Sequence, residues 1–291
     1  IHASSFGFMA LASILESALG DYRTAYSIGE MALRLNEKMG EKRYACKVNF
    51  VFSFMILHWK RHLRECIPFF QKAYQEGLDI GDRLYSGHSI NALTHCRIIL
   101  GDNIDEVLAE YSRHRDFIEA IKDPFISNMY KIFTLFCLNL KGATDNPLQL
   151  KSADFDIDEQ IETMRGSGNL MDVFIMLMSK ERSSYLFGQY EEAYHVGNEM
   201  DTLLKVPMGA YHLPEHYFYR CMSLLAVYQD KPPAERRVIL RIFKRHLKNM
   251  RRCAEICPAN YEPKYLLVRA EMMQATGDRM AVHRRHRGTR V

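Results

Sequence analysis

The sequence predicts an all-α fold built from stacked helical hairpins. Apolar residues recur at spacings of three and four along most of the chain, as on the buried side of a helix. No alternating strand pattern persists over any segment. In addition, a hairpin pattern at residues 20–31 returns at residues 188–200, which indicates an internal repeat.

Composition places the chain among ordered globular proteins. It has 291 residues, of which 47% are apolar and 25% charged, with a net charge of +4. Seven cysteines without paired spacing predict reduced thiols and a cytoplasmic protein. The longest apolar runs, Val48 to Leu57 and Ile132 to Leu140, are too short for a membrane span, which needs about 20 residues.

The repeated hairpin pattern consists of a glycine turn followed by small and aromatic residues. Its members are Gly20, Tyr22, Ala25, Tyr26, Gly29 and Met31 in the first copy, and Gly188, Tyr190, Ala193, Tyr194, Gly197 and Met200 in the second. Because small side chains let two helices approach closely, we expect the alanine and second glycine of each copy to face the partner helix of the same hairpin.

The stretch from His58 to Asp82 predicts another helix of this array. Pro68 interrupts it, so we expect a kink there or a helix that restarts near residue 67. Gly77 or Gly81 should end the helix, since glycine adopts the left-handed conformation at little cost. Trp59 and His58 are interpreted as packing residues rather than ligands.

The remaining helices follow in order and make the units tetratricopeptide-like. Their turns lie about 40 residues apart, slightly more than the 34 of a standard tetratricopeptide repeat. The prediction is a right-handed α-solenoid over residues 1–278, with an irregular loop at 141–154 and a basic, disordered tail at 279–291. The expected helical segments are 50–59, 63–74, 85–100, 104–121, 125–140, 170–186, 191–204, 217–228, 235–256 and 261–275.

Several short motifs suggest chemistry but lack the rest of their sites. His114-Arg115-Asp116 matches the start of a kinase catalytic loop, but it is predicted to lie in mid-helix and the metal-binding asparagine is missing. The alternating carboxylates Asp154, Asp156 and Asp158 lack the glycine and glutamate of a calcium loop, so helix capping is preferred.

The two cysteines closest in sequence, Cys253 and Cys257, lie one helical turn apart. They have no further cysteine or histidine nearby, and packing in the core is therefore preferred to zinc binding. Gly166-Ser167-Gly168 is interpreted as a loop. The sequence thus predicts no catalytic residue, cofactor or metal.

The predicted helix 235–256 carries a basic face opposite an apolar stripe that includes Val238, Ile239 and Phe243. Such a face suits an acidic protein partner or a nucleic acid, but it is also typical of a solvated surface or an interdomain contact. Nucleic acid is disfavoured because no stacking aromatics are interleaved. The candidate partner-binding residues are Arg241, Lys244, Arg245 and Lys248.

Three stretches together suggest a family. They are His58-Trp59, the helix from Cys66 to Tyr74 with its Gly81-Asp82 end, and the passage 247–278. They resemble the helical middle region of large signalling proteins that carry a serine/threonine-kinase-like domain, an AAA-type ATPase, and often GAF and histidine kinase domains. The likeness covers most of residues 1–278. Cys253 stands where that family usually has tryptophan, and residues 281–291 do not resemble it.

The resemblance implies a non-catalytic spacer that couples nucleotide state in an upstream ATPase to sensor or kinase domains of the same parent chain. Its partners would then be protein domains or peptides. Because the chain opens on Ile1, we expect a piece of a longer polypeptide. The alternatives are a free-standing peptide-binding adaptor and, less favoured, a nucleic-acid-binding helical array.

Overall fold

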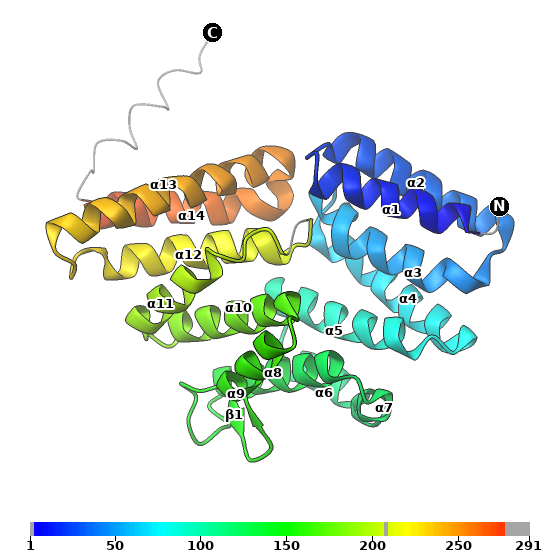
Figure 1. Ribbon diagram of the computed structural model, residues 1–291, viewed down its shortest axis with the longest axis horizontal. Coiled ribbons are helices and arrows are strands. Elements are labelled where there is room, and N and C mark those ends of the chain that lie inside the picture. Colours follow the sequence, from blue (N-terminus) through cyan, green and yellow to red (C-terminus); the bar gives the residue numbers. More distant parts are fainter. Residues whose placement is uncertain (1–2, 207–208, 277–291) are drawn as a thin grey trace, which may run out of the picture.

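A computed structural model describes residues 3–206 and 209–276, and this part of the chain folds into fourteen α-helices with very little sheet (Figure 1). The predicted all-α class is confirmed. The first helices are α1 (Ser4–Ser17), α2 (Tyr22–Met39), α3 (Lys42–Val51), α4 (Cys66–Ile80), α5 (Arg83–Ile99), α6 (Ile104–Ser112), α7 (Arg115–Ile121) and α8 (Pro124–Leu140).

After α8 the chain makes a small hairpin and six further helices. The strands are β1 (Lys151–Ser152) and β2 (Phe155–Asp156), and the helices are α9 (Ile157–Gly166), α10 (Leu170–Leu186), α11 (Tyr190–Met200), α12 (His212–Tyr228), α13 (Pro233–Ile256) and α14 (Pro258–Thr276). Helices that follow one another pack in pairs, most extensively α1 with α2, α4 with α5, and α10 with α11. The pairs α1–α2 and α10–α11 agree with the predicted hairpins, whereas α5 packs mainly against α4 and not against the segment 104–121 that was expected to be its partner.

The two ends of the described array meet. The chain descends from α1 through α5 to α8 and returns through α10 to α14, which brings α13 and α14 beside α1 and α2 (Figure 1). Trp59, Cys257 and Tyr261 form a buried cluster at this seam. The Asn260 amide nitrogen donates to the carbonyl of His58 at 2.7 Å, and the amide of Leu63 donates to Asn260 Oδ1 at 2.7 Å. The array is therefore closed by contacts between residues about 200 apart in sequence.

The seam contains the beginning of the stretch from His58 to Asp82. A π-helical segment, Phe52–Ile56, follows α3, and a 3-10 turn, Leu57–Trp59, ends it. The His58 ring is fully buried and its Nδ1 lies 2.8 Å from the hydroxyl of Tyr261, while Trp59 Nε1 donates to the carbonyl of Gly209 at 3.0 Å. Both side chains pack in the interior, as predicted.

The α4 helix begins two residues before Pro68, so that the proline lies in its first turn. Pro68 is its third residue, inside the first turn, where a missing amide hydrogen costs no intrahelical bond. The prediction of a restart near residue 67 is confirmed. Gly81 ends the helix in the left-handed conformation (φ 76°). Gly77 instead lies in mid-helix, where a Cβ would come within 2.3 Å of Ser86 Oγ.

Three expectations about the elements were wrong. The segment 104–121 is two helices, because the amides of Arg113 and His114 bond carbonyls three residues back and tighten the end of α6. His114-Arg115-Asp116 therefore lies at the start of α7, not in mid-helix. The loop 141–154 contains β1, whose pairing with β2 is too short for any alternating pattern to be visible.

The third error concerns the small residues of the first copy. Gly29 on α2 faces Phe52 of the following π-helical segment, with 2.8 Å from its ideal Cβ to the ring, and not its hairpin partner α1. The glycine serves the contact between hairpins, since consecutive hairpins must also pack. The predicted tail, 279–291, and the last residues of the predicted array lie outside the described residues.

Candidate binding pocket

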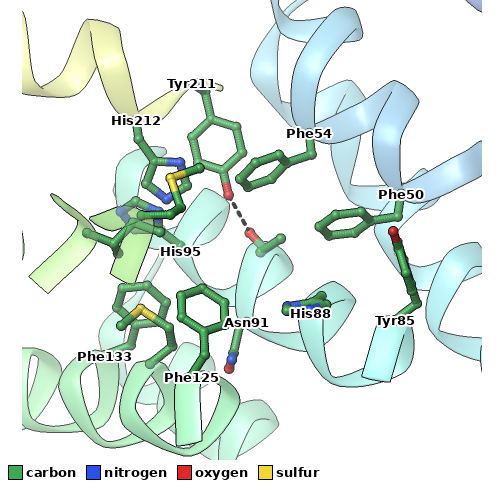
Figure 2. Close-up of a pocket in the computed structure, with 14 residues that line it drawn as sticks. Phe50, Phe54, Tyr85, His88, Asn91, His95, Phe125, Phe133, Tyr211 and His212 are labelled. Atoms are coloured by element: carbon green, nitrogen blue, oxygen red, sulfur yellow. Dashed lines mark hydrogen bonds between the residues drawn. The ribbon is translucent and has the colours of Figure 1, made fainter. Parts of the chain in front are cut away.

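The described residues enclose an aromatic cavity of about 220 Å³ at the inner side of α5. Figure 2 shows rings from several helices turned toward this cavity. Phe50 comes from α3, Phe54 from the π-helical segment, Phe125 and Phe133 from α8. The other lining residues are Tyr85, His88, Asn91, Ala92, His95, Met129, Met171, Ile175, Tyr211 and His212.

Helix α5 forms one wall because its residues face the cavity at helical spacing. Tyr85, His88, Asn91, Ala92 and His95 all line it, at intervals of one, three or four residues. The stretch 89–96 is buried throughout, since α3, α4 and α8 pack around α5. The helix is thus held on several sides and presents a fixed row of side chains.

The cavity has a half-buried rim and a buried floor. Phe50, Phe54, Tyr85, His88 and Phe125 are partly exposed at the rim. Phe50 and Phe54 stack on each other with ring centroids 5.2 Å apart. The floor is closed by buried side chains, which are His95, Met129, Phe133, Ile175, Tyr211 and His212. A ligand group entering here would meet mostly aromatic carbon.

The imidazoles of the pocket are neutral. Burial lowers the pKa of His95 well below its usual value, and burial lowers that of His212 to about 3. Burial also lowers the pKa of His88 at the rim. The pocket therefore carries no positive charge at neutral pH and suits an uncharged apolar or aromatic group.

The polar atoms around the cavity are partly paired, and Nδ1 of His212 has no hydrogen-bond partner among the described residues. The side chain of Asn91 donates to the carbonyl of Ile126 at 3.1 Å and accepts from the Tyr111 hydroxyl at 2.5 Å. Tyr211 donates its hydroxyl to the carbonyl of Ala92 at 3.2 Å, the bond drawn in Figure 2. His95 differs, because it stacks on Phe133 at 4.8 Å and neither of its ring nitrogens has a partner among the described residues.

The predicted partner-binding residues lie elsewhere. Arg241, Lys244, Arg245 and Lys248 are all exposed on α13, and none of them lines the aromatic cavity. Arg245 pairs with Asp201 at 3.1 Å. Within the described ranges, no carboxylate lies within ion-pair distance of the other three. The apolar stripe opposite them is largely as predicted, except that Val238 is 44% exposed.

A buried polar network on α10 to α13 contains the one group of described residues with the geometry of a metal site. Ligand atoms of Asp201, His216 and His246 lie within 4.8 Å of one another. However, Arg220 Nη2 lies 3.2 Å from Asp201, and Arg245 reaches the same carboxylate. Since two guanidinium groups already compensate this single carboxylate, we interpret the group as a structural network rather than a metal centre.

The pKa shifts in this network favour an ionised Asp201 and a protonated His216. Burial raises the pKa of Asp201, but hydrogen bonds from His216 and His246 and the charges of His246 and Arg220 outweigh it and hold that pKa well below its usual value. Burial lowers the pKa of His216, but the carboxylates of Glu181 and Asp201 outweigh it and raise the pKa. His216 Nδ1 lies 2.9 Å from Glu181 Oε2. A protonated His216 between two carboxylates is consistent with these contacts.

Ion pairs, a helix cap and core packing account for the other candidate motifs of the sequence. Asp154, Asp156 and Asp158 bind Lys131, Lys151 and Lys180, respectively, so their carboxylates diverge rather than converge on one ion. Asp156 also caps α9 by accepting from the amide of Asp158. All seven cysteines are buried and free, which confirms the interpretation of Cys253 and Cys257 as core residues.

Sequence reasoning missed the aromatic cavity. Its only local signal is the row Tyr85, His88, Asn91 and His95 on one side of a helix, and such a row is equally typical of a core helix. Neither the protein-family models nor the curated proteins match the chain. Within the described ranges, no helix combines the length and apolar character needed to cross a bilayer.

Proposed function

We propose that this chain is a non-catalytic interaction module whose aromatic cavity receives an apolar anchor side chain of a protein or peptide partner. The observation that carries the proposal is the cavity itself, with a rim of half-buried aromatic rings and a floor of neutral imidazoles. Aromatic rings provide large contact area at low conformational cost, which favours them in protein recognition.

The proposal includes the architecture expected from the sequence, a right-handed α-solenoid of tetratricopeptide-like hairpins. Pairwise packing of consecutive helices supports it. In such an array the inner surface is a natural position for a bound segment, because each hairpin contributes one helix to it. The cavity draws rings from α3, α5 and α8, and α5 packs against both of the other two helices.

We further propose that the module serves as a coupling segment of a larger signalling ATPase or kinase. The support is the resemblance together with one contact. Two of the stretches that carry the resemblance, His58-Trp59 and the passage 247–278, touch at the seam, where the Trp59 and Tyr261 rings lie 5.6 Å apart. Motion of one end of the array would therefore be transmitted directly to the other.

The cavity proposal is tested by peptide binding. Arrays of 15-residue peptides with a single central Trp, Phe or Leu would be probed with the wild-type chain, with Ala92→Phe, which fills the cavity, and with Ala109→Phe at an exposed site on α6. We expect peptide capture by wild type and Ala109→Phe, and at least a tenfold loss for Ala92→Phe. Equal capture by all three would refute the cavity as the site.

The coupling proposal is tested on the reading frame and on nucleotide. Flanking ATPase and kinase domains in the full reading frame would support a coupling segment, whereas stops close to both ends would favour the free-standing adaptor. The isolated chain should hydrolyse ATP no faster than buffer. A rate above the buffer control would contradict a non-catalytic module.

A further inference from the structure

A second cavity lies beside a buried arginine that has no counter-ion. Arg182 on α10 is 3% exposed. Its Nε and Nη2 are buried without a hydrogen-bond acceptor among the described residues. Its guanidinium carbon lies 4.0 Å from the centre of the Phe136 ring. The aromatic face attracts the cation but accepts no directed hydrogen bond.

This arrangement contrasts with the other deeply buried arginine. Arg220 binds Asp201, the side chain of Asn198 at 2.5 Å and the carbonyl of Tyr194 at 3.0 Å. A guanidinium group stays protonated even when buried, and an unpaired buried charge is unfavourable. Burial accordingly lowers the pKa of Arg182. Arg182 therefore lacks the ion-paired carboxylate that Arg220 has, and an anion bound beside it would be stabilised.

The cavity next to Arg182 has a volume of about 270 Å³ and is mainly apolar. Phe136, Leu140 and Leu186 contribute to its walls, and the two leucines are 38% and 46% exposed, which places them at its mouth. A ligand can therefore reach the cavity from solvent and find apolar surface along its length.

The two carboxylates of the cavity wall are already paired. Glu215 binds Lys264, another lining residue. Asp102 accepts from Arg64 at 2.7 Å and from Arg97 at 2.9 Å. Neither carboxylate lies within ion-pair distance of Arg182. Among the charged groups of this wall, the guanidinium of Arg182 is thus the one without an ionic partner in the described residues.

We propose that this cavity binds a small organic carboxylate with an apolar body, held by Arg182 at its charged end. The planar guanidinium fork matches a carboxylate, which can take two parallel hydrogen bonds. A single uncompensated positive charge suits a monoanion, and the apolar walls suit a hydrocarbon or aromatic body better than a multiply charged phosphate. The volume fits a small molecule rather than a peptide segment.

The test uses 3-phenylpropionate as the probe and 3-phenylpropionamide as its uncharged analogue. We expect millimolar phenylpropionate to raise the thermal midpoint of the wild-type chain, because a ligand that binds the folded state stabilises it. The amide should have no effect. Isothermal titration should show at least a tenfold weaker affinity for the amide. An equal response to both compounds would overturn the proposal.

Two variants separate binding from folding. Arg182→Met should lose the response to phenylpropionate while its own midpoint stays the same or rises, because the uncompensated charge is gone. Leu186→Trp should obstruct the mouth and lose binding with Arg182 in place. Arg34→Met, at an exposed position on α2, is the control that keeps the full response. Retained binding in Arg182→Met, or a fall of several degrees in its midpoint, would assign Arg182 a structural role.

Discussion

The two copies of the glycine hairpin pattern, α1–α2 and α10–α11, share a backbone arrangement but not its surroundings. Ala25 and Ala193 are fully buried in the two copies. Gly29 and Gly197 are both so closely covered that a Cβ would meet a neighbour at less than 3 Å. The repeated pattern therefore specifies the same close approach of helices at both places.

The neighbours that make this approach differ in kind. Gly29 meets the apolar rings and methyl groups of Phe52 and Ile56. Gly197 meets the carboxylate of Glu181 and the guanidinium of Arg220, which belong to the buried polar network. The comparison teaches that small residues encode proximity, while the chemistry of the contact comes from helices elsewhere in the chain.

The largest expected effect tests the polar side of this comparison. Arg220→Met should destabilise the chain by about 3–5 kcal/mol, because it breaks the ion pair of this buried guanidinium with Asp201 and leaves the carbonyl of Tyr194 without its donor. Chemical denaturation measures it. Arg237→Met, at an exposed site of α13, serves as the control and should change stability by less than about 0.5 kcal/mol. A small effect for Arg220→Met would mean that the network contributes little.

The apolar side is tested at the seam that follows the first copy. Trp59→Ala should lower stability by about 3 kcal/mol, because it opens a cavity among Tyr22, Cys257 and Tyr261. Trp59→Phe should cost less, since it keeps part of the ring contact. An unchanged thermal midpoint for Trp59→Ala would place this side chain on the surface and make it a binding candidate again.

A smaller effect distinguishes the two glycines directly. Gly29→Ala and Gly197→Ala should each cost about 1–3 kcal/mol through overpacking. In an Arg220→Met background, the cost of Gly197→Ala should fall, because the flexible methionine can move away. The cost of Gly29→Ala should not change there, since the two sites share no partner. Additivity at both glycines would contradict the assigned contacts.

The stability effect expected from Glu16→Gln on α1 depends on pH. It is small at acidic pH and grows as the pH rises. Burial raises the pKa of this carboxyl to about 8. A folded pKa above the unfolded value stabilises below about pH 4.5, and this stability is lost as pH rises to 8. Glu16→Gln should lack that loss in denaturation curves recorded from pH 5 to 9.

The second copy should respond in the opposite direction. The pKa of Asp201 is depressed, so its contribution to stability is present near neutral pH and is lost as pH falls through the acidic range.

The exposed Glu262→Gln is a control for Glu16→Gln and should leave the profile unchanged. A wild-type profile that stays flat from pH 5 to 8 would rule out the buried, protonated state of Glu16.

The sequence by itself determined the helices and much of their pairing. Local signals suffice for this, because periodic apolar residues, proline at a first turn and glycine at a helix end act within one or two turns. Pro68, Gly81 and Pro124 illustrate it, since each lies in the structure where its backbone chemistry predicts. The break between α6 and α7 was missed, because a tightened turn needs no proline or glycine.

Only the tertiary structure decided which side chains meet. The seam joins Trp59 to Tyr261, the aromatic cavity joins Phe50 to His95 and Tyr211, and the second cavity joins Arg182 to Phe136. A sequence pattern shows that a residue is buried, but it does not show its neighbours when they come from distant helices. For Arg182 this decides the interpretation, because a lone arginine in a helical pattern reads as surface until its missing counter-ion is seen.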